Sequence, residues 1–307
     1  MSRPLVISVP TQEFADDLRD LPDDVEIVVW SMEDAAPRAH LDIVMPPYMS
    51  TTRVLDRLHG VSVGLVQGES IGYDGFARLL PAGLVFANAA SVHEASTAEL
   101  ALALTLASQR SLPQFVRAQD AHRWAPEETG SLADRRVLLL GYGGVGKAVA
   151  ARLAPFETAL TVVASRARDE SGVAVHGIDE LPALLRDTEI VILTLPGGDA
   201  TRRMVDAAFL AALPDSALVV NVGRGSLVDT DALVAEVASG RLRAALDVTD
   251  PEPLPADHPL WSLPGALIVP HVGGASAAMR PRMTALLRAQ IERMRAGEEP
   301  LNVVIRT

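Results

Sequence analysis

The stretch Val137-Leu-Leu-Leu-Gly-Tyr-Gly-Gly-Val-Gly146 joins an apolar run, typical of a buried strand, to a helical pattern that continues through Lys147–Leu153. Its glycines follow the pattern Gly141-x-Gly143-x-x-Gly146. In dinucleotide-binding proteins the first such glycine makes a tight turn, the second lets the backbone approach a pyrophosphate, and the third lets helix and strand pack closely. The phosphates then face the positive end of the helix. A plain glycine-rich turn is the alternative, but a strand before the loop and a helix after it favour a dinucleotide site. The residues expected to form it are Gly141, Tyr142, Gly143, Gly144, Val145 and Gly146.

The end of the following strand indicates which nicotinamide cofactor binds. In NAD-binding proteins an acidic residue about 20 positions further along holds the ribose diol. This chain instead has Ser165, Arg166 and Arg168 in that region. A hydroxyl and two guanidinium groups suit the 2′-phosphate of NADP, which an aspartate would repel. We therefore predict NADP as the preferred cofactor. NAD is the alternative, if both arginines are solvated and Asp169 or Glu170 reaches the ribose.

Short apolar runs alternate with helical stretches along the chain, which is the pattern of a parallel sheet covered by helices. Two such series follow one another, so we predict an α/β protein with two doubly wound parallel sheets and a cleft between them. Long helices are expected at Glu94–Arg110, ended by Ser111-Leu-Pro113, and at about Ser276–Arg295, ended by Gly297. The expected strands are Leu5–Val9, Val25–Trp30, Asp42–Met45, Val63–Val66, Leu84–Ala87, Val137–Leu140, Leu160–Ala164, Ile190–Leu195, Ala217–Val222, Ala244–Val248 and Leu267–Val269.

Composition and charge narrow the class of protein. Of the 307 residues, 49% are hydrophobic and 21% are charged, which excludes a disordered chain. A formal net charge of −12 and a pI near 5.0 argue against nucleic acid or an anionic membrane as a partner. The absence of cysteine excludes disulfides and thiolate metal sites, and we predict no metal site. The first apolar run is too short for a signal peptide or a membrane span, so we expect a cytoplasmic protein.

Three polar side chains each follow an apolar run in the second strand series: Arg224, Glu252 and His271. The carboxyl ends of parallel strands share one edge of a sheet, and ligands bind there. A guanidinium group can hold a carboxylate, and a carboxylate beside a histidine raises the proton affinity of the imidazole. Together these side chains suit the reduction of a 2-keto acid. Taken singly, each has a structural alternative: an ion-pair partner, a surface acid and a cap for the following helix.

The order of four motifs resembles the D-isomer-specific 2-hydroxyacid dehydrogenases, which include glyoxylate and hydroxypyruvate reductases. The motifs are the glycine loop, Asn221-Val-Gly-Arg-Gly225, Asp247-Val-Thr-Asp-Pro-Glu-Pro253 and Pro270-His-Val-Gly-Gly274. The resemblance covers nearly the whole chain. It implies a substrate-binding domain formed by residues 1–97 and 275–307, with a dinucleotide-binding domain, residues 98–274, inserted between them. It also implies that the cleft closes over the substrate and that the protein is a homodimer formed through the cofactor domain.

The resemblance implies a role for each polar residue of the dinucleotide-binding domain. His271 would protonate the carbonyl oxygen as hydride reaches the carbon, and Glu252 would keep the imidazole oriented and protonated. Arg224 would hold the 2-keto carboxylate and polarise the carbonyl. Further cofactor contacts are expected at the strand ends, from Leu195, Pro196, Val222, Gly223, Asp247 and Gly273.

Two loops of the first domain are expected to contact the substrate. Ser70, Ile71 and Gly72 resemble the loop whose backbone amides hold the substrate carboxylate, and Tyr48 and Met49 would form a wall beside the substrate side chain. The expected substrate is a small 2-keto acid such as glyoxylate or hydroxypyruvate, and a bulkier one is left open. Two alternatives have the same fold: a dinucleotide-sensing binding protein with little or no turnover, and an enzyme that acts on an inorganic or phosphonate anion.

The remaining histidines and the larger aromatic residues have no predicted function. His93, His122, His176 and His258 are expected at the surface or in loops. Trp124 and Trp261 are expected to pack against neighbouring side chains, which is the usual role of tryptophan.

Overall fold

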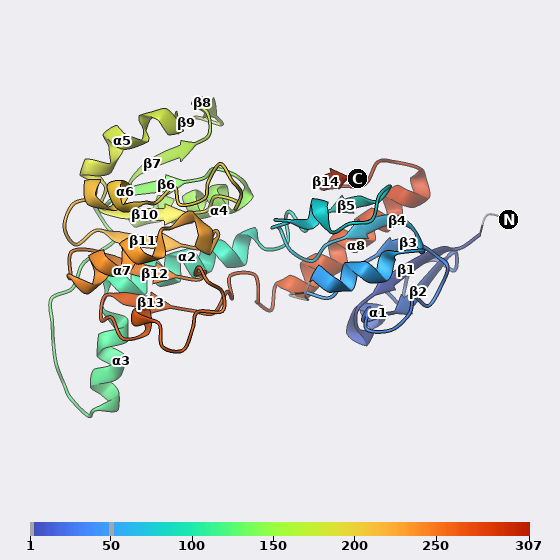
Figure 1. Ribbon diagram of the computed structural model, residues 1–307, viewed down its shortest axis with the longest axis horizontal. Helices are drawn as coiled ribbons and strands as arrows, with labels where there is room; N and C mark the ends of the chain where they lie inside the picture. Colours follow the sequence, from blue (N-terminus) through green and yellow to red (C-terminus); the bar gives the residue numbers. More distant parts are fainter. Residues whose placement is uncertain (1–2, 49–51) are drawn as a thin grey trace. The chain divides into compact units, whose positions relative to one another are not determined.

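The computed structural model describes residues 3–48 and 52–307. It divides into two compact units (Figure 1). Unit 1 comprises Met1–His93 together with Ala277–Thr307, and unit 2 comprises Glu94–Ser276. Each unit has its own sheet of mostly parallel strands with helices packed against it. The predicted α/β class with two such sheets is therefore confirmed.

The sheet of unit 1 has six strands in the order β14-β5-β4-β3-β1-β2. Its strands are β1 (Leu5–Val9), β2 (Val25–Val29), β3 (His40–Val44), β4 (Ser62–Gln67), β5 (Val85–Ala87) and β14 (Val303–Arg306). All neighbouring pairs are parallel except β14 with β5. The winding direction reverses at β1, because β2 lies on one side of it and β3 on the other. In open α/β sheets, ligands bind outside the carboxyl ends of the strands at such a point.

Two apolar cores cover the two faces of this sheet. The helices of unit 1 are α1 (Gln12–Asp17) and α8 (Met279–Ala296), with 3-10 turns at η1 (Thr52–Leu58) and η2 (Phe76–Arg78). Ile43 of β3 packs in the core that contains Leu287 and Ile291 of α8. The next residue, Val44, packs in the opposite core with Leu58. This alternation is the period-two pattern of a strand buried on both faces.

The sheet of unit 2 has eight strands in the order β13-β12-β11-β10-β6-β7-β9-β8. Its strands are β6 (Arg136–Leu140), β7 (Ala159–Ala164), β8 (Arg168–Glu170), β9 (Val173–Gly177), β10 (Ile190–Leu193), β11 (Leu218–Asn221), β12 (Arg243–Leu246) and β13 (Ala266–Ile268). Only β8 is antiparallel to its neighbour, β9. The winding direction reverses between β6 and β10, which places the glycine loop after β6 at the switch point.

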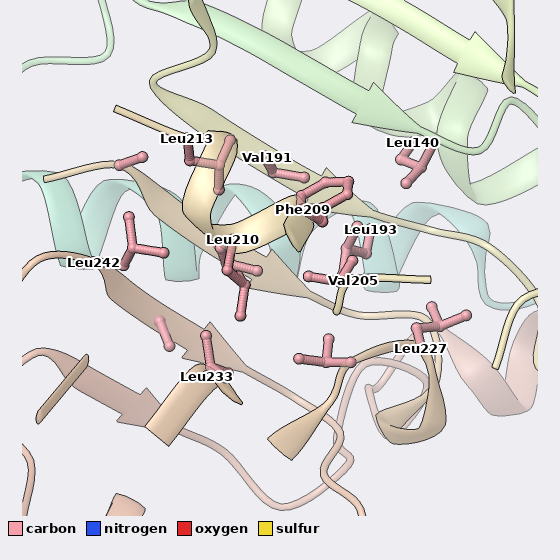
Figure 2. Packing of buried hydrophobic residues seen from close by; sticks show 14 of the residues in the cluster. Leu140, Val191, Leu193, Val205, Phe209, Leu210, Leu213, Leu227, Leu233 and Leu242 are labelled. Atoms are coloured by element: carbon pink, nitrogen blue, oxygen red, sulfur yellow. The ribbon is translucent and has the colours of Figure 1, made fainter. Parts of the chain in front are cut away.

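The helices of unit 2 lie on both faces of its sheet (Figure 1). They are α2 (Glu94–Gln109), α3 (Leu112–Asp120), α4 (Gly144–Leu153), α5 (Leu181–Leu184), α6 (Ala207–Ala212) and α7 (Thr230–Ala238), with 3-10 turns at η3 (Ala154–Phe156), η4 (Ile178–Glu180), η5 (Leu185–Asp187), η6 (Gly225–Leu227) and η7 (Pro259–Trp261). On one face, Val191 and Leu193 of β10 pack near Phe209 and Leu210 of α6 (Figure 2). On the other face, Ile192 belongs to the core that includes α2 and α4. None of the helices within residues 3–48 and 52–307 is both long and apolar enough to cross a membrane.

The helix α2 ends at Gln109, directly before Ser111-Leu-Pro113, as the sequence predicted, but a second helix follows at once. Ser111 adopts a left-handed conformation with φ +50°, and α3 begins directly after it. Pro113 lies in the first turn of α3, where its missing N–H interrupts no helical hydrogen bond. The predicted stop of α2 is therefore confirmed, whereas the sequence analysis did not predict the short helix α3 that begins in the same segment. α8 also begins three residues later than expected, at Met279.

The two tryptophans that were expected to pack are instead exposed. Trp124, in the segment after α3, is 98% exposed, and Trp261 is 52% exposed. The Trp261 indole N–H donates a hydrogen bond to the carbonyl oxygen of Pro255 at 2.8 Å. Leu112 and Val116 of α3 are also exposed. The part of unit 2 around α3 thus presents large apolar side chains to solvent.

Candidate functional site

The glycine loop connects β6 directly to α4. Gly141 has φ +112°, a conformation that L side chains rarely adopt. A Cβ atom on Gly146 would lie 2.1 Å from the carbonyl oxygen of Gly141, so helix and turn pack too closely for any side chain. A Cβ atom on Gly143 would meet nothing within 4 Å. Open backbone at the N-terminus of α4 therefore fits a dinucleotide pyrophosphate.

The ends of β10 and β11 lie on the same edge of the sheet as this loop. The hydroxyl of Thr194, after β10, donates to the carbonyl oxygen of Gly141 at 3.0 Å. A Cβ atom on Gly223, after β11, would lie 2.7 Å from the carbonyl oxygen of Leu195, so these two strand ends touch. The predicted cofactor residues on these ends are Leu195, Pro196, Val222 and Gly223.

The side chains that follow β7 differ in whether another residue already binds them, and therefore in whether they are available to a phosphate group. Ser165 and Arg166 are exposed, and no described residue pairs with the Arg166 guanidinium group. Arg168 lies on β8. Its Nε donates a hydrogen bond to Glu170 Oε2 at 2.8 Å, and its Nη2 forms an ion pair with the same oxygen at 2.7 Å. Glu170 also forms an ion pair with Lys147 of α4. Arg168 is therefore already bound to a carboxylate, whereas Arg166 is open.

The alternative acidic residues for a ribose contact are also engaged. The two cations on Glu170 hold its pKa below the ordinary value, the hydrogen bond from Lys147 having the larger effect. Asp169 accepts a hydrogen bond from the backbone N–H of Gly172 at 3.2 Å. Both carboxylates therefore already have partners, whereas the guanidinium group of Arg166 has none among the described residues.

Arg224, Glu252 and His271 follow the adjacent strands β11, β12 and β13. The charge of Arg224 acts on both other side chains, so the three lie within electrostatic reach of one another. The side chains of Glu252 and His271 are 38% and 30% exposed, so both can meet a ligand. The structure brings together the three side chains that the strand ends predicted.

A buried asparagine orients the loop that carries Arg224. Asn221 is 1% exposed; its Nδ2 donates to the Arg224 carbonyl oxygen at 2.8 Å, and its Oδ1 accepts from Gly223 N–H at 3.0 Å. A Cβ atom on Gly225 would lie 1.8 Å from the carbonyl oxygen of Thr249, in the loop that leads to Glu252. The sequence analysis gave Asn221 no separate role, although a buried amide at a strand end was the available signal.

Glu252 and His271 form the central pair of the site. Glu252 Oε1 and His271 Nδ1 are joined by a short hydrogen bond. This bond and the carboxylate charge raise the pKa of His271 above its ordinary value, against the opposing effect of burial. Burial raises the pKa of Glu252, but the hydrogen bond and charge of His271 prevail and lower it. Because Nδ1 is held by Glu252, Nε2 is the nitrogen that can exchange a proton with a ligand.

Asp247 fixes the segment that carries His271. Its carboxylate accepts hydrogen bonds from the backbone N–H groups of Val272 at 2.6 Å and Gly273 at 3.0 Å. Its carbonyl oxygen accepts from His271 N–H at 2.8 Å, and His271 takes a left-handed backbone conformation with φ +52°. Burial raises the pKa of Asp247, although the two N–H donors oppose this effect. Both carboxylate oxygens of Asp247 therefore hold the backbone of the segment after β13. The sequence analysis predicted only a cofactor contact for Asp247 and Gly273.

Residues 70–72 form the loop of unit 1 that is predicted to bind the substrate carboxylate, called here the carboxylate loop. Hydrogen bonds to its carbonyl oxygens hold this loop in place. Asn88 Nδ2 donates to the Ile71 carbonyl oxygen at 2.8 Å, and Ala89 N–H donates to the Ser70 carbonyl oxygen at 2.9 Å. Ser70 Oγ donates to the Gly72 carbonyl oxygen at 2.7 Å. Among the described residues, no acceptor takes the backbone N–H groups of Ile71 and Gly72. Two free donors on a braced loop are suited to an anion.

The second predicted substrate loop follows β3. Tyr48 is partly buried, whereas Met49 lies outside the described residues. Tyr48 stacks on His93, which is 4% exposed. His93 lies in the loop before α2, which is one of the two expected places, but it is buried there and not at the surface. A contact with a residue distant in the sequence, such as Tyr48, cannot be read from a local pattern. The sequence analysis also overlooked Glu69, which is 5% exposed beside the carboxylate loop.

Comparison with known proteins identifies the family. The model of the D-isomer specific 2-hydroxyacid dehydrogenase NAD binding domain matches residues 102–273, which lie within unit 2. A glyoxylate/hydroxypyruvate reductase B of Pectobacterium atrosepticum is 34% identical over 229 residues, 70% of this chain and 71% of the relative.

Two solved structures are similar over almost the whole chain. A D-isomer specific 2-hydroxyacid dehydrogenase of Xanthobacter autotrophicus, in complex with NADPH and MES, is 28% identical with a TM-score of 0.82, covering 99% of both chains. An NADPH-dependent glyoxylate/hydroxypyruvate reductase of Sinorhizobium meliloti, in complex with NADP and malonate, is 28% identical with a TM-score of 0.80. That match covers 100% of this chain and 98% of the other. As its four ordered motifs predict, the chain belongs to the D-isomer specific 2-hydroxyacid dehydrogenases, a family of NAD(P)-dependent oxidoreductases.

Proposed function

We propose that the protein reduces a small 2-keto acid of the glyoxylate or hydroxypyruvate type to the D-2-hydroxy acid, with NADPH as the preferred hydride donor. The observation that carries this proposal is the placement of Arg224 beside the Glu252–His271 pair at one edge of the sheet. The same edge carries the glycine loop. The names of the relatives in Pectobacterium atrosepticum and Sinorhizobium meliloti support the substrate class.

In this mechanism the side chains of unit 2 manage charge and protons. A bound reduced nicotinamide supplies the hydride that reaches the carbonyl carbon. His271, protonated at Nε2, donates its proton to the carbonyl oxygen, and solvent then returns a proton to the imidazole. Glu252 keeps the imidazole oriented and protonated through its bond to Nδ1. Arg224 binds the substrate carboxylate and polarises the carbonyl group.

Cofactor binding is proposed to involve the glycine loop, the ends of β10 and β11, and the residues after β7. The backbone at Gly143 and the N-terminus of α4 would hold the pyrophosphate. Ser165 and Arg166 would hold the 2′-phosphate of NADP. Arg168 would contribute less than the sequence suggested, because Glu170 already occupies its guanidinium group.

Substrate binding is proposed to involve the two loops of unit 1. The free N–H groups of Ile71 and Gly72, together with Ser70, would hold the carboxylate. Tyr48 would limit the size of the substrate side chain, and the same role stays a prediction for Met49.

A dinucleotide-sensing protein without turnover is the alternative function. The raised pKa of His271, whose largest cause is the hydrogen bond to Glu252, favours the enzyme because it keeps a proton donor available near neutral pH.

We also propose that the protein is a homodimer formed through α3 and the segment that follows it. In Figure 1, α3 projects from the sheet of unit 2. Leu112, Val116 and Trp124 are 49%, 56% and 98% exposed there. Such a concentration of large exposed apolar side chains is typical of a protein–protein interface, and the family resemblance makes a second copy the expected partner. A cytoplasmic location likewise stays a prediction.

The first prediction tests the reaction itself. Purified protein is expected to oxidise NADPH in the presence of hydroxypyruvate or glyoxylate, followed by the absorbance of the reduced nicotinamide. His271→Ala should lower kcat/KM by about 10²–10⁴-fold because the proton donor is lost, while NADPH affinity is unchanged. His122→Ala, an exposed histidine of unit 2, is the matched control. Cofactor binding without turnover of any 2-keto acid would favour the sensor function.

The second prediction concerns the pH dependence of reduction. The carboxylate of Glu252 raises the pKa of His271, so the protonated donor persists to higher pH than for an ordinary histidine. Glu252→Gln removes that charge and should move the alkaline decline of kcat/KM to lower pH. Glu236→Gln, which disturbs only an ion pair with Arg241, should leave the decline in place. An unchanged profile in Glu252→Gln would mean that Glu252 does not control the proton on His271.

The third prediction separates the contributions of Arg166 and Arg168 to the preference for NADPH over NADH. Arg166→Ala should raise the KM for NADPH by about 10–100-fold, the value of a charge-assisted hydrogen bond, and leave the KM for NADH unchanged. Arg168→Ala is the matched comparison and should have a smaller effect, since Glu170 competes for that guanidinium group. Equal losses for NADPH and NADH in Arg166→Ala would refute the 2′-phosphate assignment.

The fourth prediction concerns the oligomeric state. Sedimentation velocity should give twice the chain mass of 32.6 kDa for the unaltered protein. The combined substitution Val116→Ser and Trp124→Ala should shift the distribution towards the monomer, because it removes the exposed apolar surface of α3 and its following segment. Trp261→Ala, outside this surface, serves as the control. A dimer that persists in the double variant would place the interface elsewhere.

A further inference from the structure

Two loops of unit 1 are joined by a closed set of contacts among Tyr48, Glu69 and His93. The backbone N–H of Tyr48, which follows β3, donates a hydrogen bond to the side-chain carboxyl group of Glu69, which follows β4. His93 Nε2 donates to the backbone carbonyl oxygen of Glu69 at 2.6 Å. The rings of His93 and Tyr48 stack with centroids 5.6 Å apart and an interplanar angle of 21°. Each of the three residues therefore contacts both of the others.

The carboxyl group of Glu69 is buried. The residue is 5% exposed, and its Oε2 has no hydrogen-bond partner in the described part of the chain. Burial raises the pKa of Glu69 to about 8, and only the Tyr48 N–H acts in the opposite direction. Within residues 3–48 and 52–307, no charged side chain offsets the burial. At neutral pH Glu69 is therefore uncharged.

The titratable residues Tyr48 and His93 both contact Glu69. Arg282 of α8 donates to the carbonyl oxygen of Val92 at 3.5 Å, and Asp74 follows the carboxylate loop in the sequence. No charged side chain in the described part of the chain shifts the pKa of Glu69, so its titration would change the net charge at this place.

The position of Glu69 matters because the next residue, Ser70, begins the proposed carboxylate loop. An ionised Glu69 would repel an anion bound by the N–H groups of Ile71 and Gly72, and a neutral one would not. The bond to Tyr48 also joins this loop to the proposed wall of the substrate site. One side chain therefore affects both parts of the binding surface that unit 1 provides.

We propose that protonated Glu69 is a positioning residue for substrate binding: it holds the loops after β3 and β4 in register and keeps the carboxylate loop free of negative charge. The inference rests on the proposed reductase function and adds a residue outside the substrate contacts and the proton-transfer pair. It assigns to Glu69 an effect on the affinity for the 2-keto acid, and none on hydride transfer or on NADPH.

The test compares two substitutions of Glu69 in steady-state reduction of hydroxypyruvate by NADPH. Glu69→Ala removes the bond to Tyr48 and should raise the KM for hydroxypyruvate by about three- to tenfold, the effect of one hydrogen bond, with kcat and the KM for NADPH unchanged. Glu69→Gln keeps a neutral acceptor of the same shape and should match the unaltered protein at pH 7. Glu33→Gln, an exposed glutamate of unit 1, is the control for the loss of a carboxylate.

The pH dependence distinguishes positioning from a general structural role. As pH rises from 7 to 9, Glu69 ionises in the unaltered protein, so its KM should increase more steeply than that of Glu69→Gln. The titration of His271 is common to both proteins and cancels in the comparison. Identical KM profiles would overturn the proposal, as would a Glu69→Gln variant as impaired as Glu69→Ala at pH 7. A fall in kcat or NADPH affinity in Glu69→Ala would show general damage instead.

Two readouts without turnover separate this inference from the reductase proposal. Oxamate, an unreactive analogue of a 2-keto acid, should bind the NADPH-loaded protein more weakly at pH 9 than at pH 7, and this difference should shrink in Glu69→Gln. The folded state also favours protonated Glu69, so its contribution to stability is lost as pH rises from the ordinary value of 4.5 through about 8. Glu69→Gln should therefore gain Tm relative to the unaltered protein over that range. If both hold without catalysis, only the reductase proposal fails, and if neither holds, Glu69 is not a neutral positioning residue.

Discussion

The parallel pairing of β11, β12 and β13 is the constraint on which the site of unit 2 depends. It brings three loops to one edge of the sheet, but loops alone do not hold side chains in place. Asp247 supplies that restraint, because its carboxylate binds Val272 and Gly273 N–H while its carbonyl oxygen binds His271 N–H. The segment after β13 is thereby attached to the end of β12, and the imidazole meets Glu252 from a fixed backbone.

Charge is handled in opposite ways in the two units. In unit 2, Glu252 and His271 are partly exposed, and their hydrogen bond lowers the pKa of Glu252 and raises that of His271, which favours the charged form of each. In unit 1, no cation among the described residues offsets the burial of Glu69, and its pKa is raised to about 8. The difference follows from desolvation: a buried charge is tolerated only when a partner offsets the loss of water.

Local patterns were sufficient to predict the glycine loop and the three polar strand ends. Each strand is a short apolar run, and the residue that follows it must lie at the carboxyl edge of a parallel sheet, so Arg224 and His271 could be assigned to one edge. The burial of His93 and Glu69 was not evident from local patterns, because both residues contact Tyr48, which is distant from them in the sequence. The sequence predicted the end of α2 at Ser111-Leu-Pro113, but not the new helix α3 that begins there.

The sequence by itself determined the fold class, the position of the glycine loop and the strand ends that carry Arg224, Glu252 and His271, because hydrophobic periodicity and strand-end residues are local properties. Only the tertiary structure decided which of the candidate side chains are available. Arg168 is bound by Glu170, which is also held by Lys147 from another element, and this leaves Arg166 as the open cation. Likewise, the raised pKa of Glu69 comes from its burial in the folded chain, against the opposing effect of the Tyr48 N–H. Availability and protonation depend on three-dimensional neighbours, and a linear pattern does not specify them.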